Sequence, residues 1–205
     1  MKKTAKSFPA SKISVLRHTV ASTCMVVDGG DTPLLYMPGV QAARQGLARR
    51  QVVVALFTPE GKLVVCRQPV PSTAPAPILA GGRPGAGELP LLALPSGFVE
   101  AGEAREDTAM RLYAEFLFCV PPVLRQVASM GPGQEQPHFR TLYGARMPAD
   151  LHVSFFHAPG VFSVLDADEL TGLVADAAEL LQPELAWAVG QPGFLGASKQ
   201  GAEEE

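Results

Sequence analysis

One stretch, residues 94–119, constrains the fold more than any other part of the chain. Its sequence, LPSGFVEAGEAREDTAMRLYAEFLFC, places a short apolar segment, a glycine turn rich in carboxylates and an amphipathic helical pattern in direct succession. Side chains four apart on an α-helix lie one above another. The spacing therefore predicts a strand, a loop and a helix, with a stripe of alternating charge along the helix. The predicted stripe consists of Glu103, Asp107, Arg111 and Glu115.

The intervals between the polar residues of this stretch are specific. Five residues separate Gly97 from Glu103, seven separate Glu103 from Arg111, and three separate Arg111 from Glu115. This pattern, with Glu100 and Gly102 in the loop, resembles the signature box of the Nudix hydrolases, a superfamily that cleaves diphosphate linkages in nucleotide derivatives. The chain departs from the family pattern where relatives have two glutamates and a glycine. These positions hold Leu112, Phe116 and Phe118.

The resemblance covers about Gln51 to Val189. It implies an α/β fold, a Nudix-like α/β/α sandwich around a mixed β-sheet, with the box helix on one face and the closing helix on the other. Residues 1–50 are expected to be an N-terminal β extension that could serve dimerisation, because Ile13 to Val27 is rich in Val, Thr and Ile. Residues 51–190 would be the Nudix-like domain. The tail at 191–205 ends in three glutamates and is expected to be disordered.

The departures from the box bear on metal binding. In the family, the helical row that here holds Thr108, Leu112 and Phe116 would supply carboxylates pointing at divalent cations. Magnesium prefers oxygen ligands and is often held by one or two carboxylates plus waters and substrate phosphates, whereas a pair of metals needs more anionic ligands. The resemblance therefore implies at most one weakly held Mg²⁺ or Mn²⁺, with Glu115 and Glu103 as metal ligands.

The box glutamates and arginine each have two interpretations. Glu103 and Arg111 are usually a structural pair in the family, bracing loop against helix, and this role is favoured over a catalytic one. Glu115 is either a metal ligand or a solvated helix residue paired with Arg111. The candidate catalytic residues are Glu115, Glu103, Arg111 and Glu100.

Substrate-binding candidates lie upstream of the box. Gln51–Phe57 and Lys62–Arg67 are β-branched runs joined by Thr58-Pro59-Glu60-Gly61, which predicts a hairpin. The Pro/Gly-rich segment at 68–90 predicts a mobile loop, and long loops are often functional lids. Arginines beside these elements either contact a phosphate or base or simply border the sheet. The candidates are Arg49, Arg50, Arg67 and Arg83.

The remaining sequence predicts the rest of the sandwich. Val123 to Met130 and Arg140 to Met147 predict a strand pair. DADEL at 166–170 resembles the family's final strand leading into a helix with an acidic start, and acids at a helix start favour the macrodipole. Residues 170–189 predict the closing helical region. Glu135 is a minor candidate for a further catalytic glutamate.

Composition limits the class of partner and the compartment. The chain has 47% apolar and 18% charged residues and a net charge of −3, which suits one domain with a sizeable core and argues against broad nucleic-acid binding. Three widely separated cysteines suit neither a disulfide framework nor a zinc site, so a reducing, cytoplasmic location is expected. No stretch approaches the roughly 20 apolar residues that span a bilayer. The expected partners are a nucleotide diphosphate derivative and a second copy in a homodimer.

Three functional hypotheses follow from the incomplete box. In the first, the protein recognises a nucleoside diphosphate derivative but hydrolyses it slowly or not at all. In the second, it is an active metal-dependent hydrolase whose ligands are drawn from Glu100, Glu103, Glu115 and Glu135. In the third, it is a non-catalytic interaction module in which the apolar residues of the box pack against a partner or the mobile loop.

Overall fold

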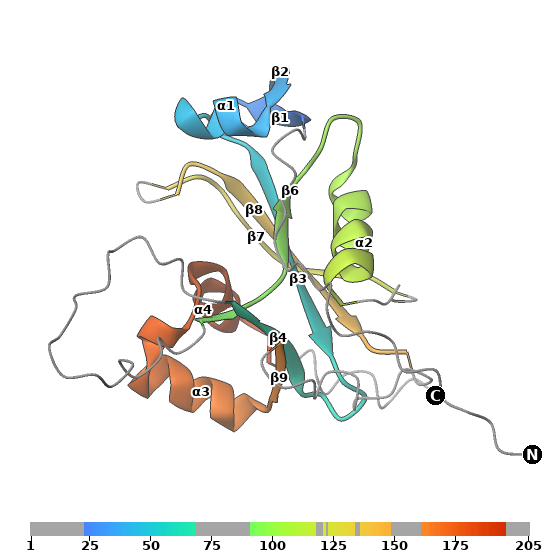
Figure 1. Cartoon of the computed structure of the whole chain (residues 1–205), viewed down its shortest axis with the longest axis vertical. Coiled ribbons are helices and arrows are strands. Elements are labelled where there is room, and N and C mark those ends of the chain that lie inside the picture. Colours follow the sequence, from blue (N-terminus) through green and yellow to red (C-terminus); the bar gives the residue numbers. More distant parts are fainter. Residues whose placement is uncertain are drawn as a thin grey trace, which may run out of the picture.

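The computed structural model describes residues 23–68, 91–117, 121, 123–133, 136–148 and 161–195. Within them, a mixed β-sheet lies between helices on its two faces (Figure 1). Several sequence predictions lie outside the described residues. These are the strand expected before residue 23, the loop from residue 69 to 90 with Arg83, and the residues Phe118 and Glu135.

The central sheet is built on one parallel pair of long strands. The strands β3 and β8 run side by side in register from Arg50↔Phe139 to Phe57↔Arg146, and every other described pair is antiparallel. The described order is β5-β4-β3-β8-β7, with β6 pairing β3 and β9 pairing β4. The mixed sheet is thereby confirmed. The strands are β3 (Arg50–Phe57), β4 (Leu63–Gln68), β5 (Leu91–Ala93), β6 (Ser96–Phe98), β7 (Arg125–Met130), β8 (Phe139–Arg146) and β9 (Phe162–Leu165).

Alternation along β3 divides the core into two halves. Successive side chains of a strand point to opposite faces of its sheet. Val52 and Val54 belong to the cluster that includes helix α2 (Arg105–Phe116). Val53 and Ala55 belong to the cluster that includes helices α3 (Ala167–Asp176) and α4 (Pro183–Val189). The α/β/α sandwich is confirmed, with the box helix on one face and the closing helices on the other (Figure 1).

Both predicted hairpins of the sheet are present. The turn between β3 and β4 closes with a hydrogen bond of 2.8 Å from Thr58 N to Lys62 O, and Gly61 has a φ of 81°. A positive φ suits glycine because it has no Cβ. The strands β7 and β8 form the second antiparallel pair.

The closing region is a broken helix rather than a continuous one. Asp166 caps its start by accepting from Glu169 N at 2.9 Å, and Glu169 in turn accepts from Asp166 N at 2.8 Å. This reciprocal capping box satisfies two backbone donors at the helix start, so the acidic start is confirmed. The elements are α3 (Ala167–Asp176), the 3-10 turn η3 (Ala178–Leu180) and α4 (Pro183–Val189).

An N-terminal hairpin with a short helix lies at the end of the sheet where β3 begins (Figure 1). Its elements are β1 (Thr23–Val27), β2 (Pro33–Pro38) and α1 (Gly39–Arg44), and the two strands form a separate two-stranded sheet. Isolated bridges Cys24↔Glu100 and Val26↔Arg49 join β1 to the main body.

The start of the predicted disordered tail was placed too early. Gln191 to Leu195 is ordered, and Phe194 is fully buried with its ring 5.5 Å from that of Phe57. An aromatic side chain that fills a core position fixes the backbone that carries it. Residues 196–205 lie outside the described residues. No helix in the described part of the chain combines the length and apolar character needed to cross a bilayer.

Candidate functional site

The box loop leaves β6 and turns into α2 at Ala104. The helix begins at Arg105, and Asp107 accepts from Ala104 N at 3.1 Å. Gly102 has a φ of 87°, a conformation that favours glycine. Glu103 therefore lies in the loop ahead of the helix, and its predicted place in a helical stripe was wrong. The side chain of Asp107 turns back to the helix start instead of joining that stripe.

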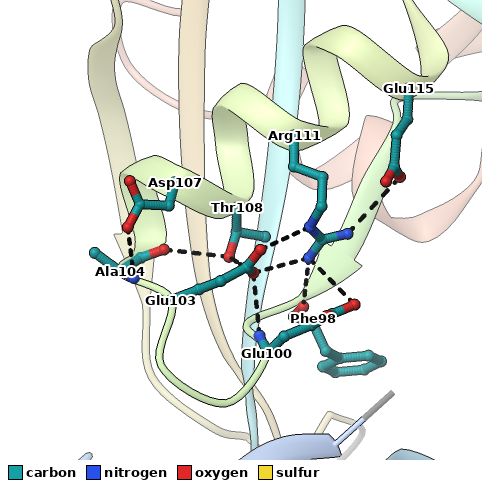
Figure 2. A network of polar contacts seen from close by, with 8 residues as sticks. All are labelled: Phe98, Glu100, Glu103, Ala104, Asp107, Thr108, Arg111 and Glu115. Carbon is teal, nitrogen blue, oxygen red and sulfur yellow. Dashed lines mark hydrogen bonds and ion pairs between the residues drawn. The ribbon is translucent and has the colours of Figure 1, made fainter. Parts of the chain in front are cut away.

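Glu103 and Arg111 form a bidentate ion pair that joins the loop to the helix (Figure 2). Arg111 donates from Nε to Oε1 at 2.8 Å and from Nη2 to Oε2 at 2.9 Å. The Oε2 atom also accepts from Thr108 Oγ1 at 2.7 Å and from Glu100 N at 3.2 Å. Hydrogen bonds from Arg111 above all lower the pKa of Glu103 to about 2. The predicted structural pair is thus confirmed.

Two further carboxylates approach the same guanidinium at its exposed side. Arg111 Nη2 lies 3.7 Å from Glu100 Oε1, and Nη1 lies 3.8 Å from Glu115 Oε2. The side chains of Glu100 and Glu115 are 41% and 52% exposed. Three carboxylates against one guanidinium leave a net charge of −2. We call this group the box cluster: Glu100, Glu103, Thr108, Arg111 and Glu115.

The two departures from the box pattern that the structure describes, Leu112 and Phe116, are directed into the protein. Leu112 is fully buried in the core half between the sheet and α2, next to Tyr113 in sequence. Phe116 is partly buried and packs against the same cluster. The side chain at position 112 therefore serves the core in this chain and does not face solvent beside Glu115.

The described carboxylates do not make up a divalent-metal site. Both oxygens of Glu103 are engaged by Arg111, and the same guanidinium approaches Glu100 and Glu115. Within the described residues, no group of three or more His, Cys, Asp or Glu side chains is placed to hold a metal ion. A hard cation needs several oxygen ligands, and the fit is poor.

A second polar group lies on the opposite face of the sheet, toward α4. Arg140 donates from Nε to Gln51 Oε1 at 3.0 Å and from Nη2 to Glu184 Oε1 at 3.2 Å. Gln51 Nε2 donates to the same Glu184 oxygen at 3.1 Å. Arg140 is only 5% exposed, and its guanidinium lies 5.3 Å from the centre of the Trp187 ring. This arginine is therefore a fixed part of the interior.

Arg49 extends this second group without a carboxylate partner among the described residues. Its guanidinium lies 3.6 Å from the centre of the Phe98 ring, Nη1 donates to Gly39 O at 3.3 Å, and Nη2 lies 3.3 Å from His138 Nε2. Burial, with Arg49 and Arg140 nearby, lowers the pKa of His138 to about 4, so the imidazole is neutral at pH 7. We call this group the arginine cluster: Arg49, Gln51, His138, Arg140 and Glu184.

No protein-family model and no curated protein sequence matches the chain. A solved structure does. The crystal structure of DR0079 from Deinococcus radiodurans is similar to this chain with a TM-score of 0.56 and 20% sequence identity, over 82% of this chain and 96% of that one. The chain has the Nudix fold.

Two weaker similarities are to structures of NrtR from Shewanella oneidensis. Its Nudix domain in complex with ADP-ribose gives a TM-score of 0.41 and 19% identity, over 66% of this chain and 87% of that one. Its complex with a 27mer DNA gives a TM-score of 0.48 and 20% identity, over 71% of this chain and 67% of that one. The expectation that this chain binds no nucleic acid stays a prediction.

Two predicted substrate arginines that the structure describes, Arg50 and Arg67, do not converge within this Nudix fold. Arg50 follows the β3 face directed at α2, and its Nε donates to Asp31 Oδ1 at 2.7 Å. Arg67 lies on the same β4 face as Leu63 and Val65, which is directed at α3 and α4, and its Nε donates to Ser163 Oγ at 2.7 Å. Arg105 also pairs with Asp31. The two candidates therefore lie on opposite faces of the sheet.

Most of the arginine cluster was missed by sequence reasoning. Gln51 and Glu184 are 133 residues apart, and Gln51 and Arg140 are 89 apart, so no local motif connects them. A usable signal existed in the strand pattern. Gln51 and Arg140 lie two residues from the buried apolar residues Val53 and Leu142, so each polar side chain shares a strand face with the core. A buried polar side chain needs a partner.

Proposed function

We propose that this protein recognises a nucleoside diphosphate derivative and that its pyrophosphohydrolase activity is weak or lost. The burial of Leu112 carries the proposal, because a fully buried leucine replaces one of the two missing box glutamates. The engagement of both Glu103 oxygens by Arg111 supports it, since the bound guanidinium neutralises that carboxylate and competes with a cation for it. The Nudix fold supports the class of ligand only by family resemblance.

Glu115 is the carboxylate on which any residual chemistry would depend. Its side chain is 52% exposed and its distance to Arg111 Nη1 is 3.8 Å, so it is free to take another partner. A single weakly bound Mg²⁺ or Mn²⁺ would find one good protein ligand here and would rely on water and ligand phosphates for the rest. Weak affinity follows from this small ligand number.

The test combines turnover with binding. ADP-ribose and other nucleoside diphosphate derivatives are incubated with the full chain and Mg²⁺ or Mn²⁺, and nucleoside monophosphate release is measured. We expect little or no turnover together with a ligand-dependent rise in the melting temperature, because a ligand bound only by the folded state stabilises it. Glu115→Gln should abolish any residual turnover. Glu179→Gln, at an exposed glutamate in η3, is the matched control.

Each other outcome favours a different hypothesis. Ordinary enzyme turnover that depends on Glu115 would show an active hydrolase with relocated ligands and would overturn the proposal. The absence of a thermal shift with every nucleotide diphosphate tested would favour the interaction module. A cytoplasmic location and a homodimeric state are part of the proposal and stay predictions until fractionation and mass measurements are made.

A further inference from the structure

Two buried nitrogens of the arginine cluster have no hydrogen-bond partner. In the described part of the chain, three buried side-chain nitrogens are unpartnered: Arg49 Nε, His138 Nδ1 and Arg105 Nε. The first two belong to side chains in contact, since Arg49 Nη2 lies 3.3 Å from His138 Nε2. Arg105 differs because its charge is paired with Asp31. Buried polar atoms nearly always have a partner, so two unpartnered atoms at one contact need an explanation.

The contact between the two side chains determines where the histidine proton lies. A guanidinium can only donate hydrogen bonds, so Nε2 of His138 accepts from Arg49 Nη2. The imidazole is neutral at pH 7, because burial and the nearby charges of Arg49 and Arg140 lower its pKa to about 4. Its proton is therefore on Nδ1. Both unpartnered nitrogens, His138 Nδ1 and Arg49 Nε, are thus donors that lack an acceptor.

The charge of Arg49 is also uncompensated within the described residues. Arg49 is only 7% exposed, and its guanidinium lies 3.6 Å from the centre of the Phe98 ring. Its other polar neighbours are Gly39 O, at 3.3 Å from Nη1, and the thiol of Cys24, which is a weak acceptor. Burial is the main influence on Arg49 and lowers its pKa. Because a buried charge is normally paired with an opposite one, the missing acceptor should be negatively charged.

We propose that Arg49 and His138 bind a singly charged oxyanion of a small molecule without the help of a metal ion. The charges of the arginine cluster, on Arg49, Arg140 and Glu184, sum to +1, so one negative charge neutralises them. A carboxylate and each phosphoryl group of a diphosphate linkage carry that charge. Each also presents two acceptor oxygens, which match the two donors, and arginine is a frequent partner of both groups.

The ligand would reach this site from the side of His138. This residue is partly exposed and follows the exposed Pro137. The site shares no side chain with the box cluster, whose charge of −2 repels anions unless a cation is bound. Binding at Arg49 and His138 therefore does not depend on the proposed function. One source of the oxyanion is the ligand proposed above, and the other is a small carboxylate.

An NMR titration of the full chain, in EDTA and at constant ionic strength, tests the proposal. Dimethyl phosphate and acetate are the probes, and the tighter one identifies the source as phosphoryl or carboxylate. We expect saturable binding that weakens at least roughly tenfold in Arg49→Met and roughly threefold in His138→Phe, because the first loses a charged donor and the second a neutral one. Arg44→Met removes the same charge at an exposed position of α1 and should bind like the unmodified chain.

The titration of His138 itself supplies a readout that a purely structural role would not change. An oxyanion beside Nδ1 stabilises the charged imidazole, so saturating probe should raise the pKa of His138 above its value of about 4 in the probe-free protein. The signal is assigned by its loss in His138→Phe, and the Arg44→Met control should show the same rise.

Three results would each overturn the proposal. These are the absence of saturable binding with both probes, an equal loss of affinity in Arg44→Met and Arg49→Met, and binding that leaves the pKa of His138 unchanged. Circular dichroism establishes that each variant is folded, and if Arg49→Met is not, His138→Phe and the pKa measurement decide. A failure here is distinct from a failure of the proposed function, whose test measures metal-dependent turnover and the response to nucleoside diphosphate derivatives.

Discussion

The box cluster and the arginine cluster lie on opposite faces of one sheet and carry opposite charge. The box cluster has a net charge of −2 and two half-exposed glutamates, whereas Arg49, Arg140 and Glu184 leave the arginine cluster at +1 with both arginines buried. Water can solvate the excess charge of the first group but much less that of the second. Burial, more than the number of contacts, therefore decides how much each cluster depends on its partners.

The largest expected effect comes from adding an acid to the apolar row of the box. Leu112→Glu should lower the free energy of unfolding by about 4 kcal/mol or more, because it places an unpaired carboxylate in a closed core. Phe116→Glu should lower it by about 1–2 kcal/mol, since Phe116 is only partly buried. Urea denaturation followed by circular dichroism measures both. Equal effects would contradict the described orientation of the two side chains.

The next effect compares one arginine from each cluster. Arg140→Met should destabilise by about 3 kcal/mol, because it leaves Gln51 and Glu184 without their buried partner. Arg111→Met should destabilise by about 1.5 kcal/mol, because the partly exposed Glu103 keeps Thr108 as a donor and can regain water. The same denaturation series measures this. A larger effect at Arg111 would reverse the comparison.

The two clusters should lose their contributions to the free energy of unfolding in two different pH ranges. Glu103 has an ordinary pKa of 4.5 that falls to about 2 in the fold, so its contribution is full above pH 4.5 and is lost as pH falls toward 2. His138 is lowered from 6.5 to about 4, so its contribution is full above pH 6.5 and is lost as pH falls toward 4. Glu103→Gln should lower the stability above its window, whereas His138→Gln should remove the loss of stability between pH 6.5 and about 4, because burial and the two arginines penalise only the charged imidazole. Unfolding free energies measured from pH 7 to 2 test this, and a shared window would refute it.

The smallest effect on stability is expected at the exposed rim of the box cluster. Glu115→Gln should change the free energy of unfolding by no more than about 0.5 kcal/mol, because exposed ion pairs contribute little. Glu103→Gln, which weakens a bidentate pair, serves as the comparison. A loss at Glu115 as large as that at Glu103 would show that the two carboxylates are held alike.

The strands and the box were predictable from sequence because their determinants are local. The Thr58 to Gly61 turn, the loop around Gly102 and the Asp166 cap each depend on residues within a few positions of one another. Glu103 was placed in the helix although the helix begins two residues later, at Arg105, since helix starts are set by capping geometry that spacing alone does not reveal.

The arginine cluster could not be read from the sequence in the same way. Its members come from β3, β8, α4 and the segments before β3 and β8, and only the parallel register of β3 against β8 brings Gln51 opposite Arg140. The same holds for Asp31, whose pairing with Arg50 and Arg105 depends on where the N-terminal hairpin meets the main body. Local sequence patterns predicted the strands and helices, whereas the pairing of distant polar side chains depends on long-range strand register.

The buried ring of Phe194 has a practical consequence for anyone who shortens or tags the protein. Because this side chain packs against Phe57 at the end of β3, truncation of the chain after α4 would leave a cavity in the core between the sheet and α4 and expose it to water. A fusion partner joined directly at residue 195 would crowd the same place. A tag or fusion partner is better attached farther along the chain, so that the buried Phe194 ring keeps its position in the core.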